Sequence, residues 1–251
     1  MMSLGLKKSL WVLSLWLAAS FAMGEEILYL VTGEFAPFSG EALPHGGMTT
    51  EITVSAFKEM GYETQIDFLP WKRGYINTRK HLYLGTFPYV EDATRKKTFL
   101  FSKPLYTTKT HFFARQNSSL LYENQQDLQG LKVCLPVGYS AREIQGFLDK
   151  GIVTIGMRPS NDAACFRALH KGRVDLYAIN SITGWAVIKK TFGDTHDFKT
   201  IGEPLLPSLY YFIVDNQHPN GQNLLDVFNN GLTAIKKKSI YQNIISRHLG
   251  I

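Results

Sequence analysis

The alternation of strand-like and helix-like segments constrains the fold of this 251-residue chain more than any other feature. Short apolar runs alternate with longer segments whose apolar residues recur at intervals of three and four. The expected strands span residues 27–31, 62–68 and 82–86, and then 131–135, 152–155 and 174–179. Strands that alternate with helices favour an α/β fold with mostly parallel sheets flanked by helices.

The segments between these strands predict helices. They span residues 47–60, 71–77, a stretch that begins at Ser140, 161–171 and a stretch from about 181. Ser140 and Glu143 have the spacing of a capping box, which places a helix N-terminus at Ser140. The rhythm therefore forms two α/β units of about 100 residues each.

Two segments rich in β-forming residues, 107–115 and 209–214, connect the units and can cross between them as extended strands. The tail begins with an amphipathic helix over residues 221–237, and a shorter helix follows. We expect this tail to pack on the first unit.

The chain therefore predicts two lobes, the first of which is discontinuous in sequence. Residues 25–109 plus 212–251 form lobe 1, and residues 110–211 form lobe 2.

The first 24 residues have the pattern of a secretory signal peptide. Lys7 and Lys8 precede an apolar run, and small residues around Gly24 precede Glu25. The alternative is an N-terminal membrane anchor, but the apolar run is shorter than the roughly 20 residues that a spanning helix needs. We expect export through the Sec pathway, cleavage near Gly24 and a periplasmic location.

The charge of the exported part is only mildly basic. The whole chain has a formal net charge of +6, and removal of Lys7 and Lys8 with the signal peptide lowers it by two, to +4. The one basic run, 236–238, comes at the end of the amphipathic helix, where cations favour the helix dipole. This distribution argues against nucleic acid as a partner.

Two cysteines, Cys134 and Cys165, lie in the exported part. An oxidising compartment permits one disulfide between them, and two buried free thiols are the alternative. The seven histidines are dispersed, and no Cys/His spacing of a metal site occurs. We therefore expect no metal and no cofactor.

Candidate ligand-binding residues follow the expected strands, where open α/β sheets bind their ligands. They are Glu34, Phe35, Pro88, Tyr89, Gly138, Tyr139, Ser140 and Asn180. The turn Gly138–Ser140 leads into the expected helix, whose free N–H groups favour an anion. The alternative is that Ser140 only caps that helix.

Arg95 is a second candidate for holding an anion, because its guanidinium offers a rigid fork to a carboxylate. Its neighbours Lys96 and Lys97 favour the alternative of a solvated surface. The chain has neither a glycine-rich phosphate loop nor a nucleophile elbow, and no pair of acids suggests acid/base catalysis. We therefore expect no catalytic residue.

The order and spacing of several short motifs resemble the extracellular solute-binding proteins of family 3, the periplasmic type that binds polar amino acids. The resemblance covers nearly all of residues 25–251. The motifs are at residues 33–38, 70–73, 87–89, 101–106 (six residues after Arg95), 172–175, 229–235 and 241–244.

The resemblance implies a type II periplasmic-binding-protein fold, with two lobes that close on a small ligand around a hinge. It implies that Phe35 and Trp71 clamp the ligand and that Arg95 pairs with its carboxylate. Gly138–Ser140 corresponds to the turn of the second lobe that meets the same carboxylate. An ABC permease in the inner membrane is the implied partner, and a monomer the implied state.

Four residues depart from the family's pattern. Asn180 stands where an Asp usually pairs with the ligand's ammonium group, and an amide lacks that charge. Pro88–Tyr89 replaces a Ser or Thr, and Leu84 replaces a common Asp. These changes leave open a ligand whose second polar group differs from the ammonium of an amino acid.

We therefore expect a non-enzymatic binding protein that carries an amino acid or related carboxylate to an ABC importer. A stand-alone ligand sensor and a dehydratase-like enzyme on the same scaffold are the alternatives.

Overall fold

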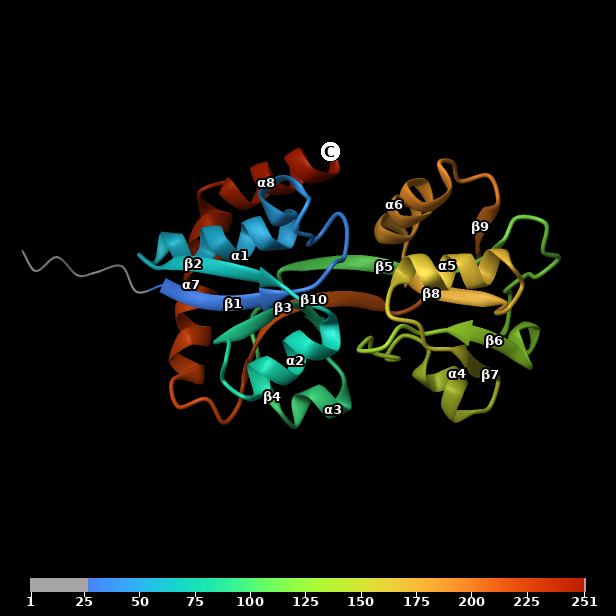
Figure 1. The fold of residues 1–251 in the computed structure, drawn as a ribbon, viewed down its shortest axis with the longest axis horizontal. Coiled ribbons are helices and arrows are strands. Elements are labelled where there is room, and N and C mark those ends of the chain that lie inside the picture. Colours follow the sequence, from blue (N-terminus) through green and yellow to red (C-terminus); the bar gives the residue numbers. More distant parts are fainter. Residues whose placement is uncertain (1–26, 251) are drawn as a thin grey trace, which may run out of the picture.

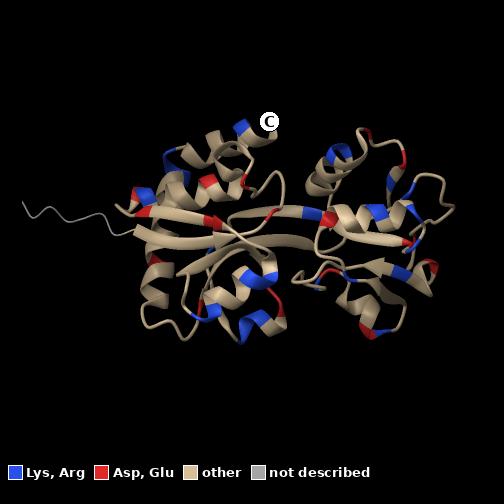
Figure 2. Ribbon diagram, viewed as in Figure 1, with Lys and Arg blue, Asp and Glu red and all other residues tan. Residues whose placement is uncertain are grey.

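The computed structural model describes residues 27–250 as two lobes joined by two long strands (Figure 1). The expected signal peptide, residues 1–24, lies outside the described residues. No helix within 27–250 is both long and apolar enough to cross a membrane. Lys and Arg are interspersed with Asp and Glu over both lobes (Figure 2).

The first lobe is built on a parallel core. Strand β1 (Ile27–Thr32) pairs in parallel with β2 (Glu63–Phe68) on one side and with β3 (Gly85–Val90) on the other. The short strand β4 (Phe99–Phe101) pairs with the second connecting strand. The helices of this part are η1 (Pro44–Gly46), α1 (Met48–Glu59), α2 (Trp71–Arg79) and α3 (Ala93–Lys96).

The second lobe repeats this arrangement. Strand β6 (Leu131–Cys134) pairs in parallel with β7 (Val153–Met157) and with β8 (Leu176–Asn180). Strand β9 (Phe198–Ile201) pairs antiparallel with the first connecting strand. The helices are η2 (Gln125–Leu128), α4 (Gln145–Asp149), α5 (Asp162–His170) and α6 (Ser181–Phe192).

The connecting strands β5 (Tyr106–Arg115) and β10 (Pro207–Asp215) run antiparallel to each other between the lobes. At one end β10 pairs with β3, and at the other end β5 pairs with β8. The sheet is therefore continuous in the order β2-β1-β3-β10-β5-β8-β6-β7. Each lobe has its own helices, and the two strands connect the lobes.

The C-terminal helices α7 (Gly221–Lys237) and α8 (Ile240–Leu249) pack on the first lobe (Figure 1). The apolar stripe of α7 expected from the sequence is buried, and the ring of Phe228 lies 5.3 Å from that of Phe57 in α1. The two helices meet closely at Gly231, where an added Cβ would lie 1.9 Å from the carbonyl oxygen of Ala56. The end of the chain thus completes the core that its beginning forms.

The prediction of a helix beginning at Ser140 is wrong. Helix α4 begins at Gln145 and has five residues. Ser140 Oγ accepts only the N–H of Arg142, two residues on, at 3.2 Å. The Glu143 carboxylate accepts a hydrogen bond from Ser208 in β10 instead of returning to Ser140. The expected capping box does not form, because the Glu143 carboxylate accepts its hydrogen bond from the connecting strand β10.

The expected strand 82–86 is also displaced, since β3 begins at Gly85 and runs through Pro88 and Tyr89. Proline at position 88 favoured an earlier end of the strand because it has no N–H to donate. The pairing of β3 with β10 changes register between Tyr211 and Ile213, so Pro88 lies at an irregular step of the ladder. The strand therefore continues past the proline.

Candidate functional site

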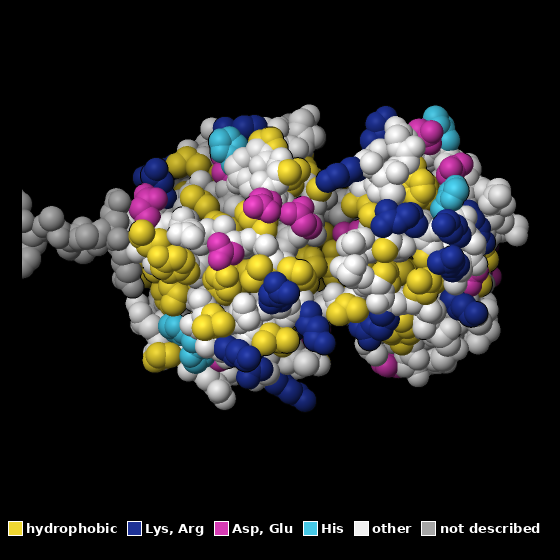
Figure 3. All heavy atoms as spheres, viewed as in Figure 1, with side chains coloured by type: hydrophobic (Ala, Val, Ile, Leu, Met, Phe, Trp, Pro, Cys, Tyr) yellow, Lys and Arg dark blue, Asp and Glu magenta, His cyan; other side chains and the backbone are white. Residues whose placement is uncertain are grey.

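A cavity of ≈ 80 Å³ lies between the lobes, beside the connecting strands. The molecular surface narrows between the lobes in the same region (Figure 3). Nine of the ten residues expected at the ligand site line the cavity: Phe35, Trp71, Pro88, Tyr89, Arg95, Gly138, Tyr139, Ser140 and Asn180. The tenth, Glu34, is exposed outside the lining, and its carboxylate accepts the N–H of Glu41 at 3.0 Å within its own loop.

Eight further residues line the cavity that the sequence did not indicate. They are Val90, Thr110, Leu135, Glu143, Ala178, Ile179, Ser208 and Tyr210. Thr110 and Ser208 belong to the connecting strands, and they line the cavity because those strands cross between the lobes. Their position in or beside the segments expected to cross between the lobes is the sequence feature that could have indicated them.

Aromatic side chains from both lobes form one wall. Phe35 and Trp71 come from the first lobe, and Tyr139 comes from the second. The three ring centroids lie 6.3 Å from one another in edge-to-face arrangements. Such pairs add roughly 0.5–1.5 kcal/mol beyond the area that they bury. The aromatic wall therefore favours the closed arrangement of the lobes.

Arg95 is buried at the lobe junction, with 7 % of its surface exposed. Its Nη1 donates to the carbonyl of Val90 at 2.8 Å, and its Nη2 donates across the cleft to the carbonyl of Gly138 at 3.0 Å. The guanidinium also lies 4.8 Å from the centre of the Tyr89 ring. The alternative of a solvated surface charge is therefore wrong for Arg95, although Lys96 and Lys97 are exposed.

The N-cap residue Asp92 positions this arginine. Its carboxylate accepts the backbone N–H groups of Thr94 and Arg95 at 3.0 and 2.8 Å, and so begins helix α3. The other carboxylate oxygen lies 3.5 Å from Arg95 Nε. Asp92 thus fixes the backbone of Arg95 and balances part of its charge, while both terminal nitrogens donate to carbonyls of residues that line the cavity.

Glycine is required at position 138 by backbone conformation and by space. Its φ is +89°, a conformation that other residues rarely adopt. An added Cβ would lie 3.1 Å from Trp71 Cβ and 3.3 Å from the backbone nitrogen of Lys72. The turn thus lets the second lobe approach the first, although it does not open a helix as the sequence suggested.

Asn180 lies at the end of β8 and caps the next helix. Its Oδ1 accepts the N–H of Thr183 at 2.9 Å, and its Nδ2 donates to Thr183 Oγ1 and to the Tyr210 hydroxyl. The side chain is 1 % exposed. Asn180 touches the cavity, but its polar atoms already have partners in the protein.

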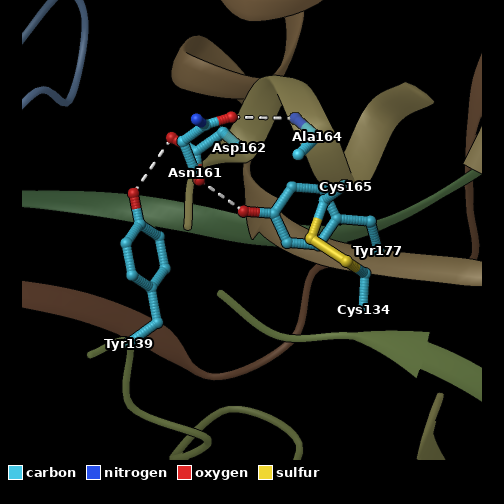
Figure 4. The surroundings of a disulfide bond; sticks show 7 residues. All are labelled: Cys134, Tyr139, Asn161, Asp162, Ala164, Cys165 and Tyr177. Carbon is cyan, nitrogen blue, oxygen red and sulfur yellow. Dashed lines mark hydrogen bonds between the residues drawn. A yellow bond between two sulfur atoms is a disulfide. The ribbon is translucent and has the colours of Figure 1, made fainter. Parts of the chain in front are cut away.

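The disulfide expected between Cys134 and Cys165 is present, with Cα atoms 5.7 Å apart (Figure 4). It ties β6 to α5. Beside it, the buried carboxylate of Asp162 accepts hydrogen bonds from the hydroxyls of Tyr177 at 2.5 Å and Tyr139 at 3.0 Å. Asp162 thus fixes the hydroxyl of Tyr139, while the Tyr139 ring packs on Phe35 and Trp71 of the first lobe.

Burial raises the pKa of Asp162 to about 6, and the two tyrosine hydrogen bonds oppose this rise. The same burial raises the pKa of the Tyr139 and Tyr177 hydroxyls well above their usual value, so both remain donors at neutral pH. This cluster fixes the second-lobe side of the aromatic wall.

Residues 27–251 match the family described as bacterial extracellular solute-binding proteins, family 3. The chain belongs to this family. The members are extracellular binding proteins, which agrees with a cavity between two lobes. No curated protein matches the chain.

Solved structures share the fold of this solute-binding protein at low sequence identity. The substrate-binding protein of an amino acid ABC transporter has a TM-score of 0.74 at 17% identity, with 90% of this chain and 100% of that one covered. A histidine kinase sensor domain with similarity to periplasmic binding proteins has a TM-score of 0.77 at 19% identity, covering 90% and 97%.

The ancestral amino-acid-binding protein AncCDT-1, a precursor of cyclohexadienyl dehydratase, has a TM-score of 0.69 at 19% identity, covering 88% and 94%. These likenesses establish the type II periplasmic-binding-protein fold for the present chain. Carriers, sensors and an ancestor of an enzyme all share it, so the fold alone does not select the activity.

Proposed function

We propose that this solute-binding protein captures a small amino acid or related carboxylate between its lobes and delivers it to an ABC importer without catalysing a reaction. The observation that carries the proposal is the buried Arg95 guanidinium, whose present acceptors are carbonyl oxygens of both lobes. A carboxylate offers the same fork two oxygens and a full negative charge, and such charge-assisted bonds are about twice as strong as neutral ones.

The ligand is enclosed by groups of both lobes in this proposal. Phe35 and Trp71 lie against its apolar part, and Tyr139 and Ser140 contact it from the second lobe. We place the lobe boundaries at residues 25–109 plus 212–251 and at 110–211, which divides both connecting strands near their middle. Binding then stabilises the closed form by its differential affinity for that form.

Export to the periplasm and docking of the closed form on a permease complete the proposal. We expect the protein to act as a monomer. Neighbouring genes that encode a permease and an ATPase would support import, whereas a neighbouring gene that encodes a receptor would support sensing. If mass spectrometry shows that the protein converts a bound compound into a product, the protein is an enzyme and not only a binding protein.

The test is a thermal-shift screen of the mature protein against the common L-amino acids and small dicarboxylates, followed by calorimetry. A ligand at 100 times its Kd stabilises the folded state by about 2.7 kcal/mol. Arg95→Ala should weaken binding by roughly 30-fold or more, since a buried charge pair loses about 2–5 kcal/mol on truncation of one partner. Arg173→Ala, at an exposed site of the second lobe, is the control. Absence of stabilisation by every compound contradicts the proposal.

A further inference from the structure

The cavity is lined by one carboxylate, that of Glu143, whose spacing from Ser140 suggested only a capping box. Glu143 lines the cavity, and its side chain is 11 % exposed. Among the residues that line the cavity, it is the one acid and Arg95 is the one base. The cavity therefore has two opposite charges, contributed by different lobes.

Hydroxyl groups of the connecting strands hold Glu143 in place. Ser208 Oγ donates to Glu143 Oε1 at 2.8 Å, and Thr110 Oγ1 lies 2.9 Å from Ser208 Oγ. A hydroxyl has one hydrogen to donate, so Thr110 must donate to Ser208. The two hydroxyl groups thus form a series of hydrogen bonds that ends on the carboxylate, so the connecting strands position Glu143.

The charge of Glu143 is only partly balanced within the protein. Arg142 Nη1 lies 3.4 Å from Oε1, but the same nitrogen donates at 2.9 Å to the carbonyl of Pro207, and the Arg142 side chain is 33 % exposed. Among residues 27–250, no donor reaches the second oxygen, Oε2. An ionised carboxylate offers about four acceptor positions, so Glu143 retains acceptor capacity at the cavity.

Asn180, the other candidate for this end of the ligand, is neutral and already bonded. Its oxygen caps α6 through Thr183, and its amide nitrogen donates to Thr183 and Tyr210. A cationic ligand group gains less from a neutral amide oxygen that already accepts one hydrogen bond than from a charged carboxylate. Glu143 has both the charge and the free oxygen that an ammonium group needs.

We propose that Glu143 binds the ammonium group of the ligand, so that the ligand is a small zwitterion held by Arg95 at its carboxylate and by Glu143 at its amine. This inference rests on the proposed function and names the ligand class for the same cavity. The cavity of ≈ 80 Å³ corresponds to roughly five to eight water-sized spaces of about 10–15 Å³. An amino acid with a short side chain fits that size.

The experiment is calorimetry at pH 7.5 with glycine, L-alanine and L-serine, each beside its counterpart without the amine: acetate, propionate and 3-hydroxypropionate. Wild type should bind at least one of the three amino acids, and its counterpart about 30-fold more weakly or not at all. Glu143→Gln, which keeps the shape and removes the charge, should bring the amino acid down to the affinity of its counterpart. Glu203→Gln, an exposed acid of the same lobe, should change neither.

The outcomes separate the two proposals. If wild type binds an amino acid and Glu143→Gln binds it equally well, the role of Glu143 is overturned and the proposed function stands. A variant that loses affinity equally for the amino acid and its counterpart shows a structural role and also overturns the inference. If wild type binds no amino acid or carboxylate at all, the proposed function fails. Discrimination by wild type against the counterparts needs no variant, so the inference stays testable if Glu143→Gln does not fold.

Discussion

Removal of the disulfide should destabilise the second lobe by an amount that follows from its position in the chain. The bond joins Cys134 to Cys165 and closes a loop with a sequence separation of 31. The loss of chain entropy in the unfolded state corresponds to about 3 kcal/mol for a 15-residue loop and about 4.7 kcal/mol for a 100-residue loop. A loop of this length therefore contributes about 4 kcal/mol.

The perturbation is the double variant Cys134→Ala, Cys165→Ala. Both cysteines are buried, so the shorter side chains also leave a small void, and the total loss should be at least about 4 kcal/mol. Because the bond lies wholly within the second lobe, a probe in that lobe is needed. Trp185 packs at 4.9 Å from Phe113 and is the only tryptophan besides Trp71 in residues 27–250.

The assay is urea unfolding followed by Trp185 fluorescence in a Trp71→Phe background, with and without the two alanine substitutions. Oxidised and reduced forms of the single Trp71→Phe protein serve as the control, and the reduced form should behave like the alanine variant within about 1 kcal/mol. A loss below about 1 kcal/mol would refute the reasoning, because it would mean that the bond does not restrict the unfolded chain as its loop length requires.

Three further perturbations have expected outcomes. In urea melts, the free energy of unfolding of wild type relative to Asp162→Asn should fall by about 2 kcal/mol between pH 4 and 7. The folded pKa of about 6 exceeds the usual 3.8, so the stability that the protonated carboxyl contributes is lost as pH rises; a difference that does not change with pH contradicts this. Gly231→Ala should lower the free energy of unfolding by about 1–3 kcal/mol in the same melts, because the added Cβ separates α1 and α7. Gly146→Ala, whose added Cβ meets no atom within 4 Å, should not lower it, and equal effects of the two substitutions would contradict the close contact. Gly138→Ala should weaken ligand binding about tenfold in calorimetry, and Gly130→Ala, also at positive φ but in open space, should leave it unchanged.

Much of the fold was predictable because periodicity and turn residues agreed with it. The apolar stripe of α7 and the alternation of strands and helices depend on spacing that the sequence shows directly. The strand β9 and the short helix α3 were missed. Four residues carry little periodicity, so such elements are defined by tertiary pairing.

The site was predictable where the local chemistry of a residue agreed with its position in the fold. The prediction failed where a residue distant in sequence provides the contact. Phe35, Trp71 and Arg95 line the cavity as expected. Glu143 has the local spacing of a capping residue, but Ser208, 65 positions later, provides its hydrogen bond. Such a contact depends on how β10 crosses the lobes, and no local pattern around Glu143 indicates it.

The most direct test of the account is a crystal structure of the mature protein with the amino acid that binds it most tightly. We predict that the ligand lies in the cavity between the lobes, with its carboxylate within about 2.7–3.2 Å of the Arg95 guanidinium. Its ammonium group should lie at the same range from Glu143. A ligand bound outside this cavity, or one whose carboxylate does not contact Arg95, would contradict the account.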